Sequence, residues 1–386
     1  MSIMDYWKFD SPSRVVFGNG VSRDTGKHML KLRAASCLVV TDPGIVKAGL
    51  LDGICKSLDE AGLKYAVYDQ VQPEPPQENV SAAMKIYTAK KCNAVIGLGG
   101  GSAIDVAKAV AMIAANGGSF ADYAGIGKVP KKCAPLALIP TTSGTGSETS
   151  IFSIMVVNGS KAGVVDHMIA ADYAIVDPEL TVSVPRHVTA FTGLDAFCHH
   201  LESFISTNAT PLGEAITLEG MRVINKYLRK AVGNGKDMEA RAWMSYASML
   251  GGYAMNMTEG AAAIHALAFA LGAKFHIPHG LSNAVMLVNT LKAVAAPEQE
   301  KLARLAQALG EDTAGLSSAG AADKAIAAIE RLVREVGCAI PLRELKIKEK
   351  DLDALADETM TQARVMGHST YQLTRDEVRK IFAATL

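Results

Sequence analysis

The first half of the chain alternates short apolar runs with longer stretches in which apolar residues recur at helical spacing. Amphipathic stretches of this kind are Gly49–Ala61 and Asn79–Lys90. Because strand and helix patterns succeed each other at about 30 residues per cycle, the pattern predicts a parallel sheet wrapped by helices. The expected strands are Val15–Gly18, Cys37–Asp42, Tyr65–Val71, Ala94–Leu98, Leu136–Pro140 and Tyr173–Asp177.

The pattern changes near Pro185. Beyond this residue β-branched runs almost disappear, and long periodic segments rich in Ala, Leu and Met take their place. We therefore expect an α/β domain with a parallel Rossmann-like sheet at residues 1–184 and an all-helical domain at residues 185–386. The periodicity is clearest in Pro211–Val232, Met238–Met257 and Asp323–Val336, whereas residues 310–322 have the composition of a loop.

Composition narrows the possible functions. The 386 residues are 49% hydrophobic and 20% charged, which excludes a disordered protein. The 39 Lys and Arg residues balance the 39 Asp and Glu residues, which argues against a nucleic-acid partner held by bulk charge. No apolar stretch approaches the roughly 18 residues of a membrane span, so we expect no membrane partner.

Two further features favour a cytoplasmic location. The N-terminal residues MSIMDYWKFD lack the basic head and apolar run of a signal peptide. The six cysteines lie far apart and form no CxxC pair, which is typical of reduced thiols.

A glycine-rich turn follows the expected strand that begins at Ala94. Glycines let backbone N–H groups approach a phosphate, and the helix that follows adds partial positive charge. The pattern departs from GxGxxG because Ser102 stands where the third glycine would be, so a purely structural turn remains an alternative. A second turn, Pro140–Glu148, concentrates hydroxyl groups after the next strand. Two such turns in one sheet favour a dinucleotide site.

Asp42 ends another expected strand. Its carboxylate can accept hydrogen bonds from ribose hydroxyls and would repel a 2′-phosphate, which favours NAD over NADP. Asp42 followed by Pro43 is equally compatible with a helix N-cap.

Four chelating side chains occur in the helical half. Asp195 and His199 are four residues apart, which places them on one face of a helix, and His265 and His279 come from a later apolar segment. One carboxylate and three imidazoles suit Fe²⁺ or Zn²⁺ with a position left for substrate. A single such histidine is usually a hydrogen-bonded core residue, but four unpaired groups would cost stability if buried.

Taken together, these motifs resemble the iron-activated (group III) alcohol dehydrogenases, a family that includes lactaldehyde reductase and 1,3-propanediol dehydrogenase. The resemblance spans nearly the whole chain and implies a two-domain architecture of the dehydroquinate-synthase-like type, with the active site between the domains. It also implies that Asp195, His199, His265 and His279 bind the metal. The implied cofactor contacts are Asp42, Gly99, Gly100, Gly101, Ser102, Thr141, Thr142, Thr145, Leu180 and, on a looser alignment, Lys161. The motifs that carry the resemblance are Gly99–Ser102, Pro140–Glu148, Asp177–Leu180, Gly193–Ala196, His199 with Glu202, and His265 through Gly280.

Two positions depart from the family pattern. Many members carry a further histidine, near the substrate, where this chain has Phe269. His276 stands where others often have a neutral residue. We hypothesise that the proton leaves through water or through His276 instead of a residue at position 269. An unchanged pH–rate profile and turnover in His276→Ala would exclude the His276 route. The alternative is that His276 is a surface or supporting residue.

The resemblance implies an NAD-dependent, metal-dependent alcohol dehydrogenase or aldehyde reductase. Hydride would pass between nicotinamide and a small alcohol or aldehyde, while the cation stabilises charge on oxygen. We also expect a homo-oligomer, a dimer or larger. Alternatives are a glycerol-dehydrogenase-like enzyme, a hydroxyacid dehydrogenase, a lyase of the dehydroquinate-synthase type, and a nucleotide-binding protein without catalysis.

Overall fold

The computed structural model describes residues 13–386, so the N-terminal residues in which the sequence predicts no signal peptide lie outside it. The chain divides into two compact units, Ser11–Val184 and Pro185–Leu386. Each unit has its own core, and the expected fold class, an α/β region with a parallel sheet followed by a helical region, is confirmed.

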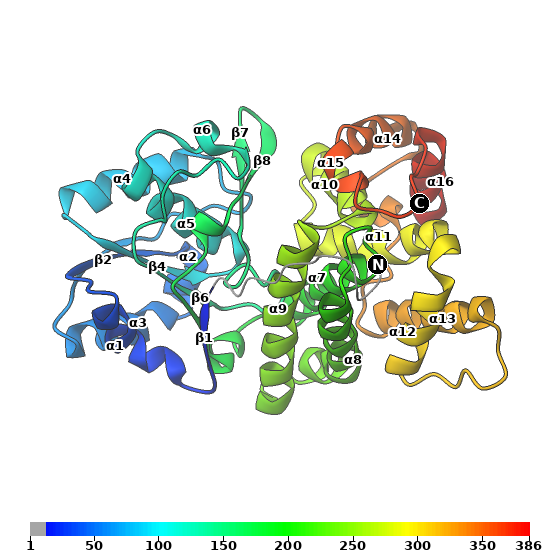
Figure 1. Ribbon diagram of the computed structural model, residues 1–386, viewed down its shortest axis with the longest axis horizontal. Coiled ribbons are helices and arrows are strands. Elements are labelled where there is room, and N and C mark those ends of the chain that lie inside the picture. The colour runs from blue at the N-terminus through cyan, green and yellow to red at the C-terminus, as the bar shows by residue number, and fades with distance from the viewer. Residues whose placement is uncertain (1–12) are drawn as a thin grey trace. The chain divides into compact units, whose positions relative to one another are not determined.

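The first unit is built on a six-stranded sheet in which every pairing is parallel, with strand order β1-β9-β6-β4-β2-β3. Alternate side chains point to opposite faces, so Leu38 and Val40 of β2 pack with α4 and α5, whereas Cys37 and Val39 pack with α1 and α3. Figure 1 shows these two pairs of helices on either side of the sheet. The strands are β1 (Arg14–Phe17), β2 (Ser36–Val40), β3 (Lys64–Tyr68), β4 (Ala94–Gly99), β6 (Leu136–Pro140) and β9 (Tyr173–Val176).

Five helices accompany this sheet, of which α3 and α4 coincide with the two amphipathic stretches that the sequence shows. They are α1 (Thr25–Lys31), α2 (Pro43–Lys47), α3 (Leu50–Glu60), α4 (Glu78–Ala89) and α5 (Gly101–Asn116). The short helix α6 (Phe120–Tyr123) comes after them.

A second, three-stranded sheet was not expected from the sequence. It consists of β5 (Gly125–Ile126), β7 (Phe152–Val157) and β8 (Ser160–Val165), with β7 and β8 forming an antiparallel hairpin. Asn158 and Gly159 form its two-residue turn at φ values of 51° and 80°. Asn-Gly is the strongest short-range hairpin signal, so this element was detectable.

The second unit is helical throughout its regular elements. Helix α7 is mostly buried because α8, α9 and α11 all pack against it. The residues expected to form a loop at 310–322 are helical from Ser318, where the Ser317 side chain accepts a hydrogen bond from the Gly320 N–H and caps α13. The helices are α7 (Arg186–Phe204), α8 (Pro211–Gly233), α9 (Met238–Thr258), α10 (Ala263–Phe275), α11 (His279–Val294), α12 (Gln299–Ala308), α13 (Ser318–Glu335), α14 (Leu352–Met360), α15 (Ala363–Met366) and α16 (Arg375–Thr385).

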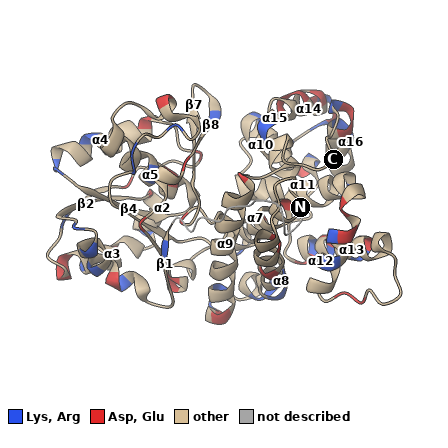
Figure 2. Cartoon of the chain, in the orientation of Figure 1, with Lys and Arg blue, Asp and Glu red and all other residues tan. Residues whose placement is uncertain are grey.

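Lys and Arg positions alternate with Asp and Glu positions along the chain in both units (Figure 2). Among the described helices, none combines the length and apolar character needed to cross a bilayer.

Candidate functional site

Three helices of the second unit bring one carboxylate and three imidazoles together. Asp195 and His199 lie one turn apart on α7, His265 lies near the start of α10, and His279 is the first residue of α11. One ligand atom from each lies within 4.8 Å of the others. The Nε2 atoms of the three histidines are 4.0, 3.9 and 3.6 Å from the same oxygen, Oδ1 of Asp195.

These spacings fit a set of groups around one cation. Donors about 2.1 Å from a tetrahedral ion lie roughly 3.4 Å from one another, and the observed separations are slightly wider. Imidazole nitrogen and carboxylate oxygen are also the donors that iron and zinc accept. The described residues therefore fit a divalent transition metal in both distance and chemistry.

The cluster is buried on all but one side. The side chains of Asp195 and His265 are 2% and 3% exposed, whereas that of His279 is 31% exposed. Burial alone would raise the pKa of Asp195. The neighbouring imidazoles and the hydrogen bond from Asn283 lower this pKa by more than burial raises it. The pKa of this carboxyl therefore lies below its usual value, and the group is an anion at neutral pH.

Glu202 orients one of the imidazoles. It lies one turn after His199 on α7, and its Oε2 accepts a hydrogen bond from Nδ1 of His265. Its Oε1 accepts a hydrogen bond from the Ile264 N–H at the start of α10. The carboxylate thus caps this helix and keeps the proton of His265 on Nδ1, which leaves Nε2 as a lone-pair donor towards Asp195.

Asn283 is a supporting residue that the sequence analysis missed. It is fully buried on α11, and its Nδ2 lies 2.6 Å from Oδ1 of Asp195 and 3.2 Å from Nε2 of His279. Its position one turn after His279 was the available signal. The amide fixes the carboxylate and the exposed imidazole relative to each other.

The candidate nucleotide turns lie side by side at the carboxyl ends of two central strands of the six-stranded sheet. From β2 the chain moves outward to β3 and then crosses to β4 on the other side, so β2 and β4 flank a topological switch point. Open α/β sheets bind ligands at this place. The glycine turn follows β4 and the hydroxyl-rich turn follows β6, which is the adjacent strand.

The two turns are in direct contact. A Cβ at Gly100 would lie 3.6 Å from Oγ1 of Thr142, and one at Gly101 would lie 3.0 Å from Cγ2 of Thr145. Gly99 adopts a φ of +149°, and a Cβ there would lie 2.8 Å from that of Ala103. The turn therefore needs glycine at position 99 both for its backbone conformation and for close packing.

The remaining residues of this group are also near the switch point. Ser102 follows Gly101 at the start of α5, and the Thr141 N–H donates a hydrogen bond to the Gly99 carbonyl. Leu180 lies in the 3₁₀ turn Pro178–Thr181, directly after β9, and packs against the sheet core.

Asp42 caps a helix, which is one of the two roles that its sequence allowed, and its contact with a ribose stays a prediction. Its Oδ1 accepts hydrogen bonds from the N–H groups of Gly44 and Ile45 at 2.8 and 3.1 Å, so it caps α2. Its Oδ2 faces the glycine turn, 3.2 Å from where a Cβ of Gly99 would lie. Capping therefore leaves one carboxylate oxygen beside the switch point.

Lys161 does not belong to the six-stranded sheet or to the turns that follow its strands. It is on β8 of the three-stranded sheet, and its Nζ is 2.7 Å from Oε1 of Glu74. Its expected role as a cofactor contact stays a prediction.

Comparison with known proteins gives the family. The family described as "Iron-containing alcohol dehydrogenase" matches residues 12–178, and "Fe-containing alcohol dehydrogenase family, C-terminal" matches residues 189–386. The chain belongs to the iron-containing alcohol dehydrogenases. The family resemblance noted in the sequence is thereby confirmed, and the chain is an oxidoreductase of this alcohol dehydrogenase family.

Individual relatives cover nearly the whole chain. It is 39% identical over 383 residues to "Long-chain-alcohol dehydrogenase 1" of Geobacillus thermodenitrificans (strain NG80-2), which covers 97% of both chains. It is 37% identical over 350 residues to "NAD-dependent methanol dehydrogenase" of Bacillus methanolicus, covering 90% of this chain and 92% of that one. A crystal structure of 1,3-propanediol oxidoreductase superposes with a TM-score of 0.96 at 32% identity, covering 99% of this chain and 100% of that chain.

The two positions that depart from the family pattern, 269 and 276, are each within four residues of a histidine of the cluster, but their environments differ. Phe269 is one turn after His265, and its ring stacks on that of His279 with centroids 5.5 Å apart. His276 is exposed and ends α10 with a φ of 54°. Phe269 therefore presents an apolar ring beside the most exposed imidazole, whereas His276 shapes the turn that leads to His279.

His200 is a structural histidine in this family member. It is fully buried, and its Nε2–H donates a 2.8 Å hydrogen bond to the Ala247 carbonyl on α9. Burial lowers the pKa of His200 to about 4, so the ring is neutral at neutral pH. Gly220 of α8 makes room for it, because a Cβ there would lie 2.1 Å from the ring.

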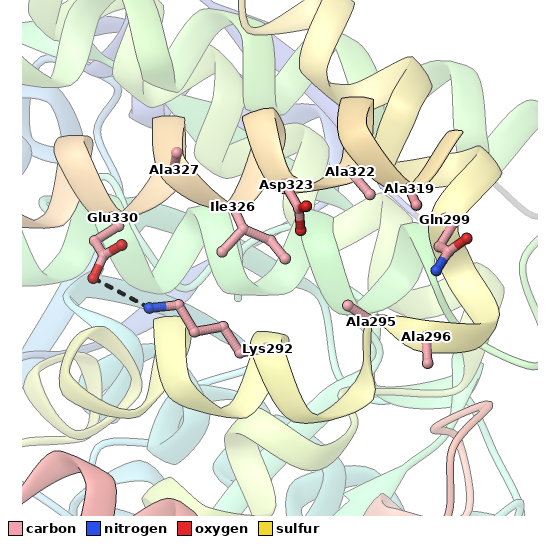
Figure 3. A pocket seen from close by; sticks show the side chains of 10 residues that line it. All are labelled: Lys292, Ala295, Ala296, Gln299, Ala319, Ala322, Asp323, Ile326, Ala327 and Glu330. Carbon is pink, nitrogen blue, oxygen red and sulfur yellow. Dashed lines mark hydrogen bonds and ion pairs between the residues drawn. The ribbon is translucent and has the colours of Figure 1, made fainter. Parts of the chain in front are cut away.

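A hollow in the second unit is separate from this chemistry. It has lining residues from α11, α12 and α13, and Figure 3 shows small side chains such as Ala295 and Ala322 with the Lys292–Glu330 ion pair at one end. None of its lining residues belongs to the Asp195 cluster. Its charged lining residues are Lys292, Asp323 and Glu330, and the described residues here form no group of three or more metal-binding side chains.

Proposed function

We propose that the protein is an NAD-dependent alcohol dehydrogenase or aldehyde reductase that binds Fe²⁺ or Zn²⁺ through Asp195, His199, His265 and His279. The observation that carries this proposal is the placement of three imidazole Nε2 atoms 3.6–4.0 Å from a single oxygen of Asp195. Family membership supports it, because the matched family is named for its iron.

The residues around the cation each have a definite task. A bound divalent metal supplies a Lewis acid, which favours alkoxide over alcohol and polarises an aldehyde near neutral pH. Asp195 supplies negative charge, and Glu202 and Asn283 hold the donors in place. Because His279 is the most exposed of the four, the open side for substrate lies next to it and to Phe269.

The cofactor assignment depends on the switch point. Backbone N–H groups at Gly99–Ser102 and the hydroxyls of Thr141, Thr142 and Thr145 suit a pyrophosphate at the start of α5. The free Oδ2 of Asp42 suits ribose hydroxyls and disfavours the extra phosphate of NADP. The relative named as an NAD-dependent methanol dehydrogenase supports the same preference.

The substrate class follows from the residues on the open side. Phe269 places an apolar ring on this side, which suits the hydrocarbon part of an alcohol or aldehyde. The names of the relatives, which include methanol, long-chain-alcohol, 1,3-propanediol, choline and sulfoacetaldehyde enzymes, support an alcohol or aldehyde substrate and span a range of sizes and charges.

We further propose a cytoplasmic homo-oligomer. The six cysteines are all free, which suits a reducing compartment. Light scattering of the purified protein tests the expected dimer or larger assembly, and a monomeric mass would contradict it.

Asp195→Ala tests the metal assignment. We expect this variant to lose both its metal and its activity, because the only anion among the four donors is removed from a buried site. Elemental analysis gives the metal content, and NADH consumption across a panel of short aldehydes gives the activity.

Asp376→Ala is the matched control, since Asp376 is an exposed aspartate on α16 of the same unit. It should retain both metal and turnover. Full turnover in Asp195→Ala would show that the assignment is wrong.

A further inference from the structure

A buried lysine underlies the hydroxyl-rich turn. Lys108 of α5 is fully buried, and its Nζ donates hydrogen bonds to the Ser150 carbonyl at 2.8 Å, the Ser150 Oγ at 3.1 Å and the Phe152 carbonyl at 2.7 Å. All three acceptors lie just after the turn that ends at Glu148. The ammonium group therefore holds this backbone against α5.

Asp105 makes a second attachment on the same face of α5. Its carboxylate accepts hydrogen bonds from the Ser147 Oγ at 2.8 Å and from the Ile154 N–H at 3.1 Å. Its backbone carbonyl accepts another from the Ser153 Oγ at 2.9 Å. Residues three apart lie on the same face of a helix. Asp105 and Lys108 therefore form hydrogen bonds with one continuous segment, residues 147–154.

The two attachments connect the candidate nucleotide turns through one rigid element. Helix α5 begins at Gly101, inside the glycine turn, and the gripped segment begins two residues after Thr145. A shift of residues 147–154 along α5 would move the hydroxyls of Thr141–Thr145 relative to the glycine N–H groups. A phosphate held by both sets of donors would lose hydrogen bonds in such a shift.

Burial of these charged groups costs free energy unless hydrogen bonds offset it. Burial lowers the pKa of Lys108 to about 8 and raises that of Asp105 to about 6, and it raises the pKa of the nearby Glu148 to about 7. The hydrogen bonds that offset this cost all run to residues 147–154, so both side chains depend on the position of that segment.

We propose that Asp105 and Lys108 are positioning residues, a clamp on α5 that aligns the hydroxyl-rich turn with the glycine turn and so sets the affinity for the dinucleotide. This inference rests on the proposed function, because it assumes that these turns bind NAD(H). It concerns the first unit alone and makes no use of the Asp195 cluster.

Lys108→Met in the full-length protein tests the clamp. Loss of three hydrogen bonds to the segment should raise the Kd for NADH, measured by its fluorescence, about tenfold or more. KM for NADH should rise in parallel, while kcat at saturating NADH and the metal content stay near those of the wild type. Ser147→Ala is a milder second variant that removes one hydrogen bond to Asp105, and we expect a rise of about threefold.

Lys85→Met is the matched control, because Lys85 is an exposed lysine on α4 of the same unit. Its Kd for NADH should equal that of the wild type. A merely structural role for Lys108 would lower the number of binding sites and kcat without changing Kd, and that result would overturn the clamp. Unchanged Kd in both Lys108→Met and Ser147→Ala would do the same. If the wild type itself does not bind NADH, the proposed function is wrong, and the proposal that Asp105 and Lys108 set dinucleotide affinity is wrong as well.

Discussion

Two adjacent histidines show how strongly position on a helix decides the chemistry of a side chain. His199 and His200 are neighbours in sequence, but successive residues of a helix point about 100° apart. His199 faces Asp195, whereas His200 faces α8 and α9, where Gly220 and the Ala247 carbonyl enclose it. One ring is therefore available to a cation, and the other is a neutral hydrogen-bond donor in the core.

Glu202→Gln tests whether the partner of a donor matters as much as the donor itself. The amide can still accept from the Ile264 N–H, but its NH₂ group faces the Nδ1–H of His265 and cannot accept from it. We expect metal affinity to fall about 10–100-fold, as is usual when such a partner is lost. Competition with a chromophoric chelator measures the change.

Glu300→Gln, an exposed substitution on α12, is the control and should leave metal affinity unchanged. Equal affinity in Glu202→Gln and the wild type would mean that Glu202 only caps α10.

At the scale of elements, the packing of α7 against α8 and α9 depends on one small residue. The ring of His200 lies where a side chain at position 220 would project, and its hydrogen bond to Ala247 prevents the ring from turning away. This packing holds α7 in place, and α7 carries Asp195, His199 and Glu202. Helix packing and the candidate metal site are thus coupled through a residue that touches no donor atom of the site.

Gly220→Ala should destabilise the protein although alanine is the better helix former. The new Cβ would lie 2.1 Å from the His200 ring, and overpacking of this kind costs about 1–3 kcal/mol. Gly233→Ala on the same helix meets nothing within 4 Å, so it should be neutral or stabilising by up to about 1 kcal/mol. Urea unfolding of the two variants measures the contrast, and equal midpoints would contradict the packing argument.

At the scale of the whole molecule, the two units carry different chemistry on separate cores. The first unit brings glycines, hydroxyls and Asp42 to the carboxyl edge of a parallel sheet. The second unit brings anionic and imidazole groups to one point between three helices. The residues named for each arrangement belong to one unit, so each ligand should stabilise that part of the chain most.

Hydrogen exchange of the intact protein tests this division. We expect Zn²⁺ to slow amide exchange most in α7, α10 and the first turn of α11, and NAD to slow it most near Gly99–Ser102 and Thr141–Thr145. Removal of the metal with a chelator should restore fast exchange in the helices while the sheet stays protected. The reverse pattern, with the metal acting on the sheet, would contradict the assignment.

The residues that were predictable from the sequence are those whose chemistry has a local signature. Asp195 and His199 are four apart on a periodic helix, and the two turns directly follow apolar strands, so their grouping followed from spacing. The family resemblance placed His265 and His279 with them. The hairpin at Phe152–Val165 was not predicted, although its first strand is largely apolar and Asn158 and Gly159 mark its turn.

Other residues could not be found in this way because their partners are distant in sequence. Asn283 meets Asp195 across 88 positions, and Lys108 meets Ser150 across 42. The sequence around Lys108 does not distinguish a buried lysine from an exposed one, because the groups that bind its ammonium lie at positions 150 and 152. Such contacts depend on tertiary packing, which no local pattern encodes.

The fit between His200 and Gly220 also constrains how this protein can diverge. A larger residue at position 220 is tolerable only after the ring at position 200 has been replaced by something smaller, so the order in which substitutions accumulate matters. Descendant sequences should therefore change these two positions in a fixed succession, even though they are twenty residues apart and lie on different helices.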